Sequence, residues 1–524
     1  MWVIIKDIRV NFLIISIIFI LFKLSIFCSE SKAIQSESTC DSAQRIFYVA
    51  TDGDDSNPGT IERPWKTIQK AAEALQAGDT VYIRAGTYHE RVIPKNSGSE
   101  NCYITYMAYP GEDVIIDGSG IKLPDDLAGL FEISDKGYIK VIGLKIINAG
   151  LFDNNAGIFV IDSSHIIIQD NYIYNTVSSG IGIWNSKAII VDGNEVVLAC
   201  NDGEQECITV AGTDTFEVKN NHVHHSGPGS KGGEGIDIKD GSRNGKVFKN
   251  RVHDLNNRVG IYIDAWDKHT YDIEVFKNLV FNIFNNDGIA IGSEKGGLLE
   301  NITIYDNIIY NNGLSGITLS DAGDSQTHPL KDIKIINNTI YKNGGSNNWG
   351  GGISIENSDI EGLLIRNNIC SKNVFFQIQR EAEVKNFKID HNLIDGFRGY
   401  DDEILGNEYI LEDPRFVNPD KGDFHLKFGS PAIDMGSANE APQEDFEGCP
   451  RPINGKVDIG VYEYYLKGDI DGDGNITLTD VILILRILSG EDIIIPFCWI
   501  DVNGDGKLGL DDGIYIIQRL AELR

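Results

Sequence analysis

Two neighbouring segments in the middle of the chain bring acidic, basic and aromatic residues together. Asp237 and Lys239 lie in the segment GIDIKD, and Tyr262 and Asp264 lie in the similar segment GIYIDA. Glu294 directly follows a third segment of this kind, GIAIGS. Side chains of a β-strand alternate between its two faces, so residues two apart share a face. Because the isoleucines of each segment are expected to point inward, these polar side chains should share one outward surface.

The residues on this surface suit two kinds of sugar chemistry. Stacked strands lie about 4.8 Å apart, which places Lys239 beside Asp264 and puts the Cα atoms of Asp237 and Asp264 about 8 Å apart. Two carboxylates at such a distance can cleave a glycosidic bond, with Asp264 and either Asp237 or Glu294 as the acid/base pair. β-Elimination on a uronic acid would use Lys239 as the base. That base must be neutral, whereas Asp237, Asp240 and Asp264 favour its charged form.

Aromatic residues near these carboxylates predict a sugar-binding groove. Trp184 lies on the same face two repeat units before Lys239, and Tyr262 and Trp266 flank Asp264. An exposed ring beside carboxylates is what such a groove needs, and an acidic groove suits a neutral or cationic sugar better than a polyuronate. The alternative is structural. Lys239 would then join neighbouring coils as an ion pair, and the carboxylates would pair with lysines and backbone amides.

Histidines form a second group, which consists of His222, His224, His225 and His253. His222 and His224 alternate with Val223, so they share a face of a strand. This spacing would allow a zinc site, although solvated surface side chains are the simpler interpretation. The eight cysteines contain no CxxC motif, which argues against a cysteine-based zinc site.

A repeat positions all of these residues. Short strands recur as GIFVID, GIGIWN, CITVAG, GIDIKD, GIYIDA, GIAIGS, GITLSD and GISIEN between residues 157 and 357. A second strand follows each and usually ends in asparagine, at Asn171, Asn194, Asn221, Asn250, Asn278, Asn307, Asn338 and Asn368. Alternating segments of this length are strands, and one unit per coil of about 23–31 residues predicts a parallel β-solenoid. A leucine-rich repeat is excluded because the units carry Ile/Val pairs and no helical segment. The asparagines should adopt left-handed backbone at one corner and form a ladder.

The ends of the chain have different compositions. Residues 1–29, with an apolar run at 11–28 after Lys6 and Arg9, predict a signal peptide, followed by a linker at 30–45. A signal anchor is the alternative, although Lys23 interrupts the apolar run. No second apolar span follows, so the mature chain should be secreted and outside the membrane. The formal net charge of -31 would repel nucleic acid and anionic membranes. Cys40–Cys102 and Cys200–Cys207 are two disulfides that such a chain could form.

Residues 61–77 show the spacing of an amphipathic helix that would cap the open N-terminal end of the solenoid. Its apolar side would consist of Trp65, Ile68, Ala71, Ala72 and Leu75, and Pro64 would stand near its start.

Two segments near the C-terminus fit twelve-residue, EF-hand-like calcium loops, which place oxygen ligands at positions one, three, five, seven, nine and twelve. In residues 469–480 the ligands would be Asp469, Asp471, Asp473, the Asn475 carbonyl, Thr477 and Asp480. In residues 501–512 they would be Asp501, Asn503, Asp505, the Lys507 carbonyl and Asp512. Apolar helices are expected at 481–488 and 513–523. Calcium should supply part of the folding energy of so small a module.

Residues 47–92 (FYVATDGD to HERV) look like the opening of secreted right-handed parallel β-helix proteins, which include the pectate-lyase-like families. The resemblance implies a mostly β fold, with a right-handed parallel β-helix at 46–404 and a closing segment at 405–465. The run from Glu234 to Lys239 also looks like the D-G-F-x-x-K region of calcium-dependent pectate lyases, with Glu234 in place of a calcium-binding Asp. Residues 258–262 stand where that family carries D-D-G-x-D, so its calcium site is not reproduced.

The two loop-plus-helix units at 466–524 resemble a type I dockerin, which implies calcium binding and docking to a cohesin on a scaffold or cell-surface protein. A calcium-stapled module without a partner is the alternative. Loop positions ten and eleven differ between the halves, Leu478–Thr479 against Leu510–Asp511, so the resemblance does not extend to symmetric dual-mode docking. Taken together, the resemblances imply an extracellular enzyme that cleaves a polysaccharide, as a lyase or a glycoside hydrolase. A non-catalytic glycan-binding or surface-display protein is the alternative.

Overall fold

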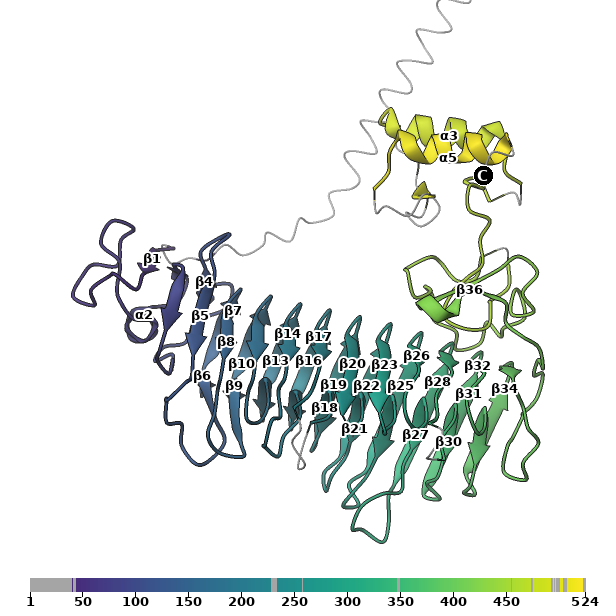
Figure 1. Cartoon of the computed structure of the whole chain (residues 1–524), viewed down its shortest axis with the longest axis horizontal. Helices are drawn as coiled ribbons and strands as arrows, with labels where there is room; N and C mark the ends of the chain where they lie inside the picture. The colour runs from purple at the N-terminus through teal and green to yellow at the C-terminus, as the bar shows by residue number, and fades with distance from the viewer. Residues whose placement is uncertain are drawn as a thin grey trace, which may run out of the picture.

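The chain folds into a long stack of parallel strands that form three sheets (Figure 1). The computed structural model describes residues 40, 44–227, 233–256, 258–345, 349–453, 455–472, 475–491, 493, 495, 500–502 and 507–521. From β6 to β33 each coil contributes one strand to each sheet, and all strand pairs within the three sheets are parallel. The mostly β fold class is therefore confirmed.

The three sheets are named A, B and C here. Sheet A contains β1 (Ile46–Val49), β2 (Thr80–Ile83), β4 (Ile104–Ala108), β7 (Gly137–Ile142), β10 (Ser164–Gln169), β13 (Lys187–Asp192), β16 (Asp214–Lys219), β19 (Arg243–Phe248), β22 (Thr270–Phe276), β25 (Leu299–Tyr305), β28 (Leu330–Ile336), β31 (Ile360–Arg366) and β34 (Lys385–Asp390). Sheet B contains β3 (Gly86–Tyr88), β5 (Val114–Asp117), β8 (Lys145–Ile147), β11 (Tyr172–Tyr174), β14 (Glu195–Val197), β17 (His222–His224), β20 (Arg251–Asn256), β23 (Leu279–Phe284), β26 (Ile308–Tyr310), β29 (Thr339–Tyr341), β32 (Ile369–Ser371) and β35 (Leu393–Asp395). Sheet C contains β6 (Ala128–Ser134), β9 (Asn155–Ile161), β12 (Ile181–Trp184), β15 (Ile208–Ala211), β18 (Ile236–Lys239), β21 (Ile261–Asp264), β24 (Ile289–Gly292), β27 (Ile317–Leu319), β30 (Ile353–Ile355) and β33 (Ile378–Arg380).

Alternating Ile and Val side chains fill the space between the sheets. Within one coil, Ile238 of sheet C, Val247 of sheet A and Val252 of sheet B are all fully buried in the same core. Burying one such side chain stabilises the fold by about 1.5–3 kcal/mol. The two strands of the predicted repeat unit are those of sheets C and A. Apart from the alternation of His222, Val223 and His224, the strands of sheet B were not part of the prediction.

Buried asparagines form the predicted ladder at the corner between sheets A and B. The Asn171 side-chain amide donates to the Oδ1 atom of Asn194 at 3.0 Å, and the series continues from coil to coil as far as Asn392. The left-handed backbone lies one residue earlier, for example at Asp170 (φ 54°) and Lys249 (φ 55°). The expectation of left-handed ladder asparagines is therefore wrong. The preceding residue makes the corner, which leaves each asparagine side chain directed into the stack.

A short helix, α2 (Ile68–Ala74), covers the N-terminal end of the stack (Figure 1). Its apolar residues and Trp65 pack into the main core, as the helical spacing predicted. The helix is shorter than the predicted 61–77, because the Thr67 side chain caps it by accepting a hydrogen bond from the Lys70 amide. Pro64 therefore precedes the helix, in a stretch where Trp65 bridges to Val49.

The closing segment packs on the outer face of sheet B near the C-terminal end of the solenoid. It contains the antiparallel strands β36 (Phe416–Asn418) and β37 (Asp423–Leu426), joined by the 3-10 helix η1 (Pro419–Lys421). A second hydrophobic core joins it to the solenoid, with Ile308, Tyr341, Ile369 and Leu393 on one side and Phe416, Phe424, Ile459 and Val461 on the other.

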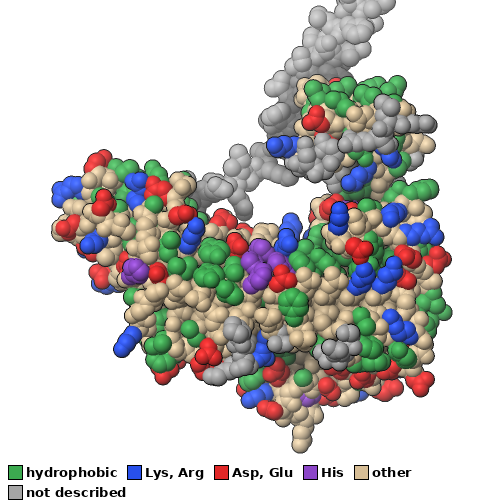
Figure 2. Space-filling view, viewed as in Figure 1, with side chains coloured by type: hydrophobic (Ala, Val, Ile, Leu, Met, Phe, Trp, Pro, Cys, Tyr) green, Lys and Arg blue, Asp and Glu red, His purple; other side chains and the backbone are tan. Residues whose placement is uncertain are grey.

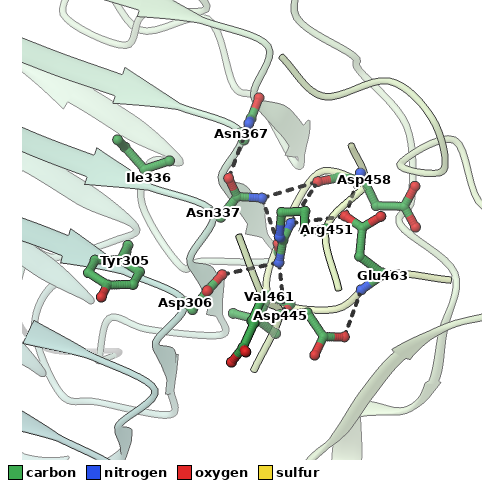
Figure 3. A network of polar contacts seen from close by, with 12 residues as sticks. Tyr305, Asp306, Ile336, Asn337, Asn367, Asp445, Arg451, Asp458, Val461 and Glu463 are labelled. Atoms are coloured by element: carbon green, nitrogen blue, oxygen red, sulfur yellow. Dashed lines mark hydrogen bonds and ion pairs between the residues drawn. The ribbon is translucent and has the colours of Figure 1, made fainter. Parts of the chain in front are cut away.

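Arg451 anchors the closing segment to the solenoid at the centre of a buried polar network (Figure 3). Its guanidinium contacts the carboxylates of Asp306 and Glu463 at 3.2 Å each, and all three side chains are fully buried. Asn337 of the solenoid donates to the carbonyl oxygens of Asp458 and Gly460. Burial raises the pKa of Asp306 to about 8 in spite of the arginine.

Two helices, α3 (Leu478–Leu488) and α5 (Leu510–Leu520), pack against each other in the C-terminal module (Figure 1). Both begin three residues before the predicted starts, because Thr477 and Asp480 form a capping box on α3 and the Asp512 carboxylate accepts from the Gly509 amide on α5. Their small core consists of Ile470, Val481, Ile484, Ile500, Val502 and Ile516.

Cysteine pairing matches one of the two predictions. Cys40 and Cys102 form a disulfide. Cys200 and Cys207 do not, because their sulfur atoms lie 3.8 Å apart as buried free thiols. The predicted signal peptide lies outside the described residues. In the part of the chain that the structure describes, no helix has the length and apolar character needed to cross a membrane.

Candidate active site

A cavity of about 510 Å³ opens on the outer face of sheet C. It gathers every residue that the sequence predicted for catalysis or sugar binding. The lining consists of Trp184, Glu204, Gln205, Glu206, Ala211, Glu234, Asp237, Lys239, Asp240, Arg258, Tyr262, Asp264, Trp266 and Glu294. Residues more than one hundred positions apart in the sequence thus meet in one pocket because the coils stack.

The strand register places these side chains on the outer wall. Ile236 pairs with Ile261 and Asp237 pairs with Tyr262 across β18 and β21. The isoleucines are fully buried in the core, so the residues between them point outward. The predicted alternation is therefore present. The carboxylates are less exposed than the sequence predicted: only 3% of Asp237 and 2% of Asp264 is accessible to solvent.

Lys239 lies among carboxylates at the centre of the pocket. Its ammonium contacts the Glu206 carboxylate at 2.7 Å and the Asp237 carboxylate at 3.6 Å, and it donates to the Gln205 side chain at 3.2 Å. Burial alone would lower the pKa of Lys239, but the charges of Glu206 and Asp237 outweigh it and raise that pKa above its usual range. The lysine is therefore held in its charged form, as the sequence argument predicted.

Glu206 was missed by the sequence analysis. It precedes the segment CITVAG as Glu234 precedes GIDIKD, so the two glutamates occupy the same place in successive units. Asp240, which was expected to act on Lys239, instead pairs with Lys268 at 2.9 Å. Comparing the residues just before each strand would have found Glu206.

Burial raises the pKa of the carboxyl groups on the pocket floor. Burial and the neighbouring charge of Glu206 raise the pKa of Glu234 to about 7 and raise that of Asp237 well above its usual range. Arg258 approaches Glu234 at 3.8 Å. The Oδ1 atom of Asp237 is buried without a hydrogen-bond partner, so it can accept a proton or a hydrogen bond from a bound molecule.

Asp264 is the second carboxyl group suited to proton transfer. Burial raises its pKa to about 7, although its Oδ1 atom accepts a hydrogen bond from the Trp266 amide at 2.8 Å. A carboxyl group with this pKa is partly protonated at neutral pH and can act as an acid.

Aromatic side chains line the mouth of the pocket. Trp266 is 37% exposed, and the Lys295 ammonium lies 4.6 Å from the centre of its ring. The Trp184 ring lies over Gly182, where a Cβ atom would come within 2.3 Å of it. Tyr262 was predicted to bind sugar with its ring, but its hydroxyl donates to the Glu294 carboxylate at 2.9 Å. The two tryptophans thus offer rings to a ligand, and Tyr262 holds Glu294.

The pocket does not offer the carboxylate cluster that a calcium ion of the pectate-lyase type would need. Among the described residues, no three carboxylates of the pocket bring their oxygens within 4.8 Å of one another. The ammonium of Lys239 already lies between Glu206 and Asp237. Arg258 and Tyr262 stand where further calcium-binding aspartates would be required. A lysine therefore neutralises this acidic cluster.

The first C-terminal loop, by contrast, fits a hard cation. Carboxylate oxygens of Asp469, Asp471 and Asp480 lie within 4.8 Å of one another. Asp480 is fully buried, and its Oδ1 atom accepts from the Ile470 amide at 2.6 Å. Asp512, the matching residue of the second loop, is also fully buried. The predicted ligands Asp473, Asn503 and Asp505 lie outside the described residues.

Comparison with known proteins supports this architecture. A family described as a Pel9A-like, right handed beta helix region matches residues 47–386, and a type I dockerin domain matches residues 467–520. The uncharacterized protein YwoF of Bacillus subtilis is 29% identical over 435 residues, which cover 74% of this chain and 92% of YwoF. The pectate lyase PEL9 of Emericella nidulans is 33% identical over 142 residues, which cover 24% of this chain and 33% of PEL9.

Among solved structures, the crystal structure of pectate lyase Pel9A is similar with a TM-score of 0.51 and 17% identity, over 82% of this chain and 98% of that one. At this identity the likeness establishes the fold alone. The family match covers well over half of the chain and includes every residue that lines the pocket. The chain therefore belongs to the Pel9A-like right-handed β-helix family and carries a type I dockerin domain at its C-terminal end.

Proposed function

We propose that the chain is an extracellular polysaccharide lyase, which breaks glycosidic bonds at uronic acid residues by β-elimination. The observation that carries the proposal is the pocket on sheet C, where a buried lysine lies among carboxyl groups of raised pKa. The family match and the partial similarity to a protein named as a pectate lyase support elimination as the reaction.

The acidity of the pocket does not exclude a uronate substrate. Seven carboxylates and two cationic side chains line it. The pKa values of Glu234 and Asp264 are raised to about 7, so part of the formal negative charge is absent at neutral pH. Lys239 and Arg258 are the cationic groups on the floor that can attract the carboxylate of a uronic acid.

The side chains allow a balanced elimination. A base must remove the proton from C5, after which the electrons form the C4–C5 double bond and the C4–O bond breaks. Asp237 in its ionised form is the proposed base, because its raised pKa makes it a stronger one and Lys239 is held charged. Asp264 in its protonated form would give its proton to the leaving oxygen. Trp184 and Trp266 would bind the sugar rings.

Glycoside hydrolysis is the second candidate, and the pKa of Asp264 near 7 favours it equally. In that reaction Asp264 would protonate the leaving oxygen, while Asp237 or Glu294 assists water or attacks the sugar. The same pocket would then accept a neutral polysaccharide.

One assay separates these candidates. The purified chain is incubated with polygalacturonate, rhamnogalacturonan, alginate, xylan and arabinan, and the ultraviolet absorbance of unsaturated products and the release of reducing ends are followed together. A lyase gives both signals, whereas a hydrolase gives reducing ends alone. Neither signal, with retention on one polysaccharide in affinity electrophoresis, would leave a non-catalytic glycan-binding protein and refute the proposal.

We also propose that calcium-loaded loops hold the C-terminal module in a form that docks to a cohesin on a scaffold. Matching apolar side chains are exposed on its two helices: Leu478, Ile482, Leu485 and Leu488 on α3, and Leu510, Ile514, Ile517 and Leu520 on α5. They supply an apolar stripe on each helix, as a docking surface needs. A pull-down with cohesins, with and without EGTA, tests this. Binding that persists in EGTA would contradict the role of calcium.

A further inference from the structure

A cluster of histidines lies on the outer face of sheet B, away from the pocket on sheet C. Figure 2 shows these imidazoles together at the surface near the middle of the solenoid. Three consecutive coils supply the cluster. Glu195 pairs with His222 across β14 and β17, and His224 pairs with His253 across β17 and β20. Because residues two apart share a face, these four side chains all lie on the outer wall, Glu195 and His222 at one outward position and His224 and His253 at the next.

Side-chain atoms of three of these residues lie close together, and His253 joins them through His222. One ligand atom each of Glu195, His222 and His224 lies within 4.8 Å of the other two. The Nε2 atoms of His222 and His253 are 2.7 Å apart, and the Nε2 atom of His224 lies 3.2 Å from the Glu195 carboxylate. The ring centres of His222, His224 and His253 lie 4.1 to 5.2 Å from one another.

Neighbouring side chains hold the outer nitrogens of two rings. The Nδ1 atom of His253 contacts the Asp254 carboxylate at 2.7 Å, and the Nδ1 atom of His224 contacts Nδ1 of His225 at 2.6 Å. A carboxylate only accepts, so neutral His253 carries its proton on Nδ1 and presents a bare Nε2 to the cluster. Metal-binding histidines in proteins are fixed in this way, by a partner on the nitrogen that does not bind the metal.

We propose that Glu195, His222, His224 and His253 bind a zinc-type divalent cation on the outer face of sheet B. Three imidazoles and one carboxylate form a four-coordinate donor set suited to Zn²⁺, whereas Ca²⁺ takes six to eight oxygen ligands. The cation would replace the protons that His222 and His224 share with their neighbours through Nε2, and these protons would move to Nδ1. It would join three consecutive coils at one point.

The close contact between His222 and His253 must open only slightly to fit a tetrahedral ion. Zinc–nitrogen bonds of 2.0–2.1 Å place two tetrahedral ligand atoms about 3.3 Å apart. The His222 and His253 nitrogens would therefore separate by about 0.6 Å from their present 2.7 Å. Arg251 is the cationic residue beside the proposed site, because it pairs with His222 across β17 and β20. Its guanidinium lies over the Phe281 ring, 5.3 Å from the ring centre.

Zinc titration of the full chain tests the proposal. The chain is produced without a histidine tag and kept in excess calcium, so that the C-terminal loops are filled. ZnCl₂ is then added in a calorimeter, and CoCl₂ is used to record the visible absorption of tetrahedral cobalt. The test variant is His222→Ala with His224→Ala. The matched control is His269→Ala with His391→Ala, because both of these histidines lie outside the cluster and pair with other carboxylates.

The wild-type chain and the control should bind one equivalent of zinc and show the tetrahedral cobalt spectrum. The test variant should bind zinc at least tenfold more weakly and lose that spectrum. The zinc affinity of Glu195→Gln should lie between those of the wild type and the test variant. Zinc should also raise the melting temperature of the wild type and leave that of the test variant unchanged. No zinc binding by the wild type, or equal binding by wild type and test variant, would overturn the proposal. If the test variant fails to fold, as judged by its melt without zinc, Glu195→Gln with His224→Gln replaces it under the same criteria.

Discussion

Replacing Lys239 by methionine should destabilise the solenoid strongly. The ammonium neutralises Glu206 and Asp237, whose residues are 5% and 3% exposed. Removing one partner of a buried ion pair leaves an uncompensated charge, which costs about 3–5 kcal/mol. Unfolding entropy of about 2.1 cal/mol/K per residue gives about 0.9 kcal/mol/K for a unit of about 420 residues. The melting temperature of Lys239→Met should therefore fall by about 3–6 °C.

The loss should depend on pH in one direction. The folded state raises the pKa values of Asp237 and Glu234, so their ionisation destabilises the fold as pH rises through those values. Without the lysine this cost is larger at pH 8, above the pKa of about 7 for Glu234, than at pH 5, below it. Differential scanning calorimetry at both pH values measures it.

Two further variants control the measurement. Lys246→Met removes a half-exposed lysine 3.7 Å from Glu274 and should change stability by at most about 1 kcal/mol. Adding Glu206→Gln to Lys239→Met should recover at least half of the loss, since it removes one uncompensated charge. A Lys239→Met protein as stable as the wild type, or equally destabilised at both pH values, would refute this reasoning.

Three other perturbations follow from particular contacts. If Asp264 donates a proton with a pKa near 7, the cleavage rate should fall about tenfold per pH unit above that value in a pH–rate profile; a flat profile between pH 7 and 9 would exclude the role. Arg451→Met should leave the buried carboxylates of Asp306 and Glu463 without their cation and lower the stability of the fold by about 3–5 kcal/mol. Hydrogen exchange in residues 445–463 should then be faster, and unchanged exchange would contradict the anchoring network. EGTA should remove the helical circular dichroism of α3 and α5 and leave the β signal, because their core is small and Asp480 and Asp512 are buried; full helicity in EGTA would rule out calcium-dependent folding.

The sequence predicted two of the three sheets, for a physical reason. Most strands of sheets A and C carry two inward apolar residues in alternation, as Ile236 and Ile238 do. Most strands of sheet B have three residues and one inward side chain, as in β11 (Tyr172–Tyr174), so no alternation marks them. The ladder asparagines were visible because they recur once per coil. The left-handed residue before each one varies among Asp, Gly, Asn, Lys and His, which hides it.

The candidate site was predictable where it depends on the stacking of strands. Lys239 and Asp264 hold the same place in successive repeat units and Asp237 lies two residues before Lys239, so strand alternation alone puts all three on one wall. The other features of the site depend on the loops between the strands. Glu206 lies just outside its strand and was missed, yet it is the closest carboxylate to the Lys239 ammonium. The burial of Asp237 and Asp264 also depends on loop conformation, which strand periodicity does not specify. Strand periodicity also does not specify whether Cys200 and Cys207, which lie close together, form a disulfide, and they do not.

Mutation of the proposed proton donor tests the central claim most directly. The initial rate of the wild type is compared with that of Asp264→Asn on the polysaccharide that gives unsaturated products. Asp214→Asn, at the first residue of β16 and outside the pocket, is the matched control. We predict a loss of at least a hundredfold for Asp264→Asn and a wild-type rate for Asp214→Asn. Folding of each variant is checked by its melting temperature. A folded Asp264→Asn protein that cleaves at the wild-type rate would show that the pocket on sheet C is not where the reaction takes place.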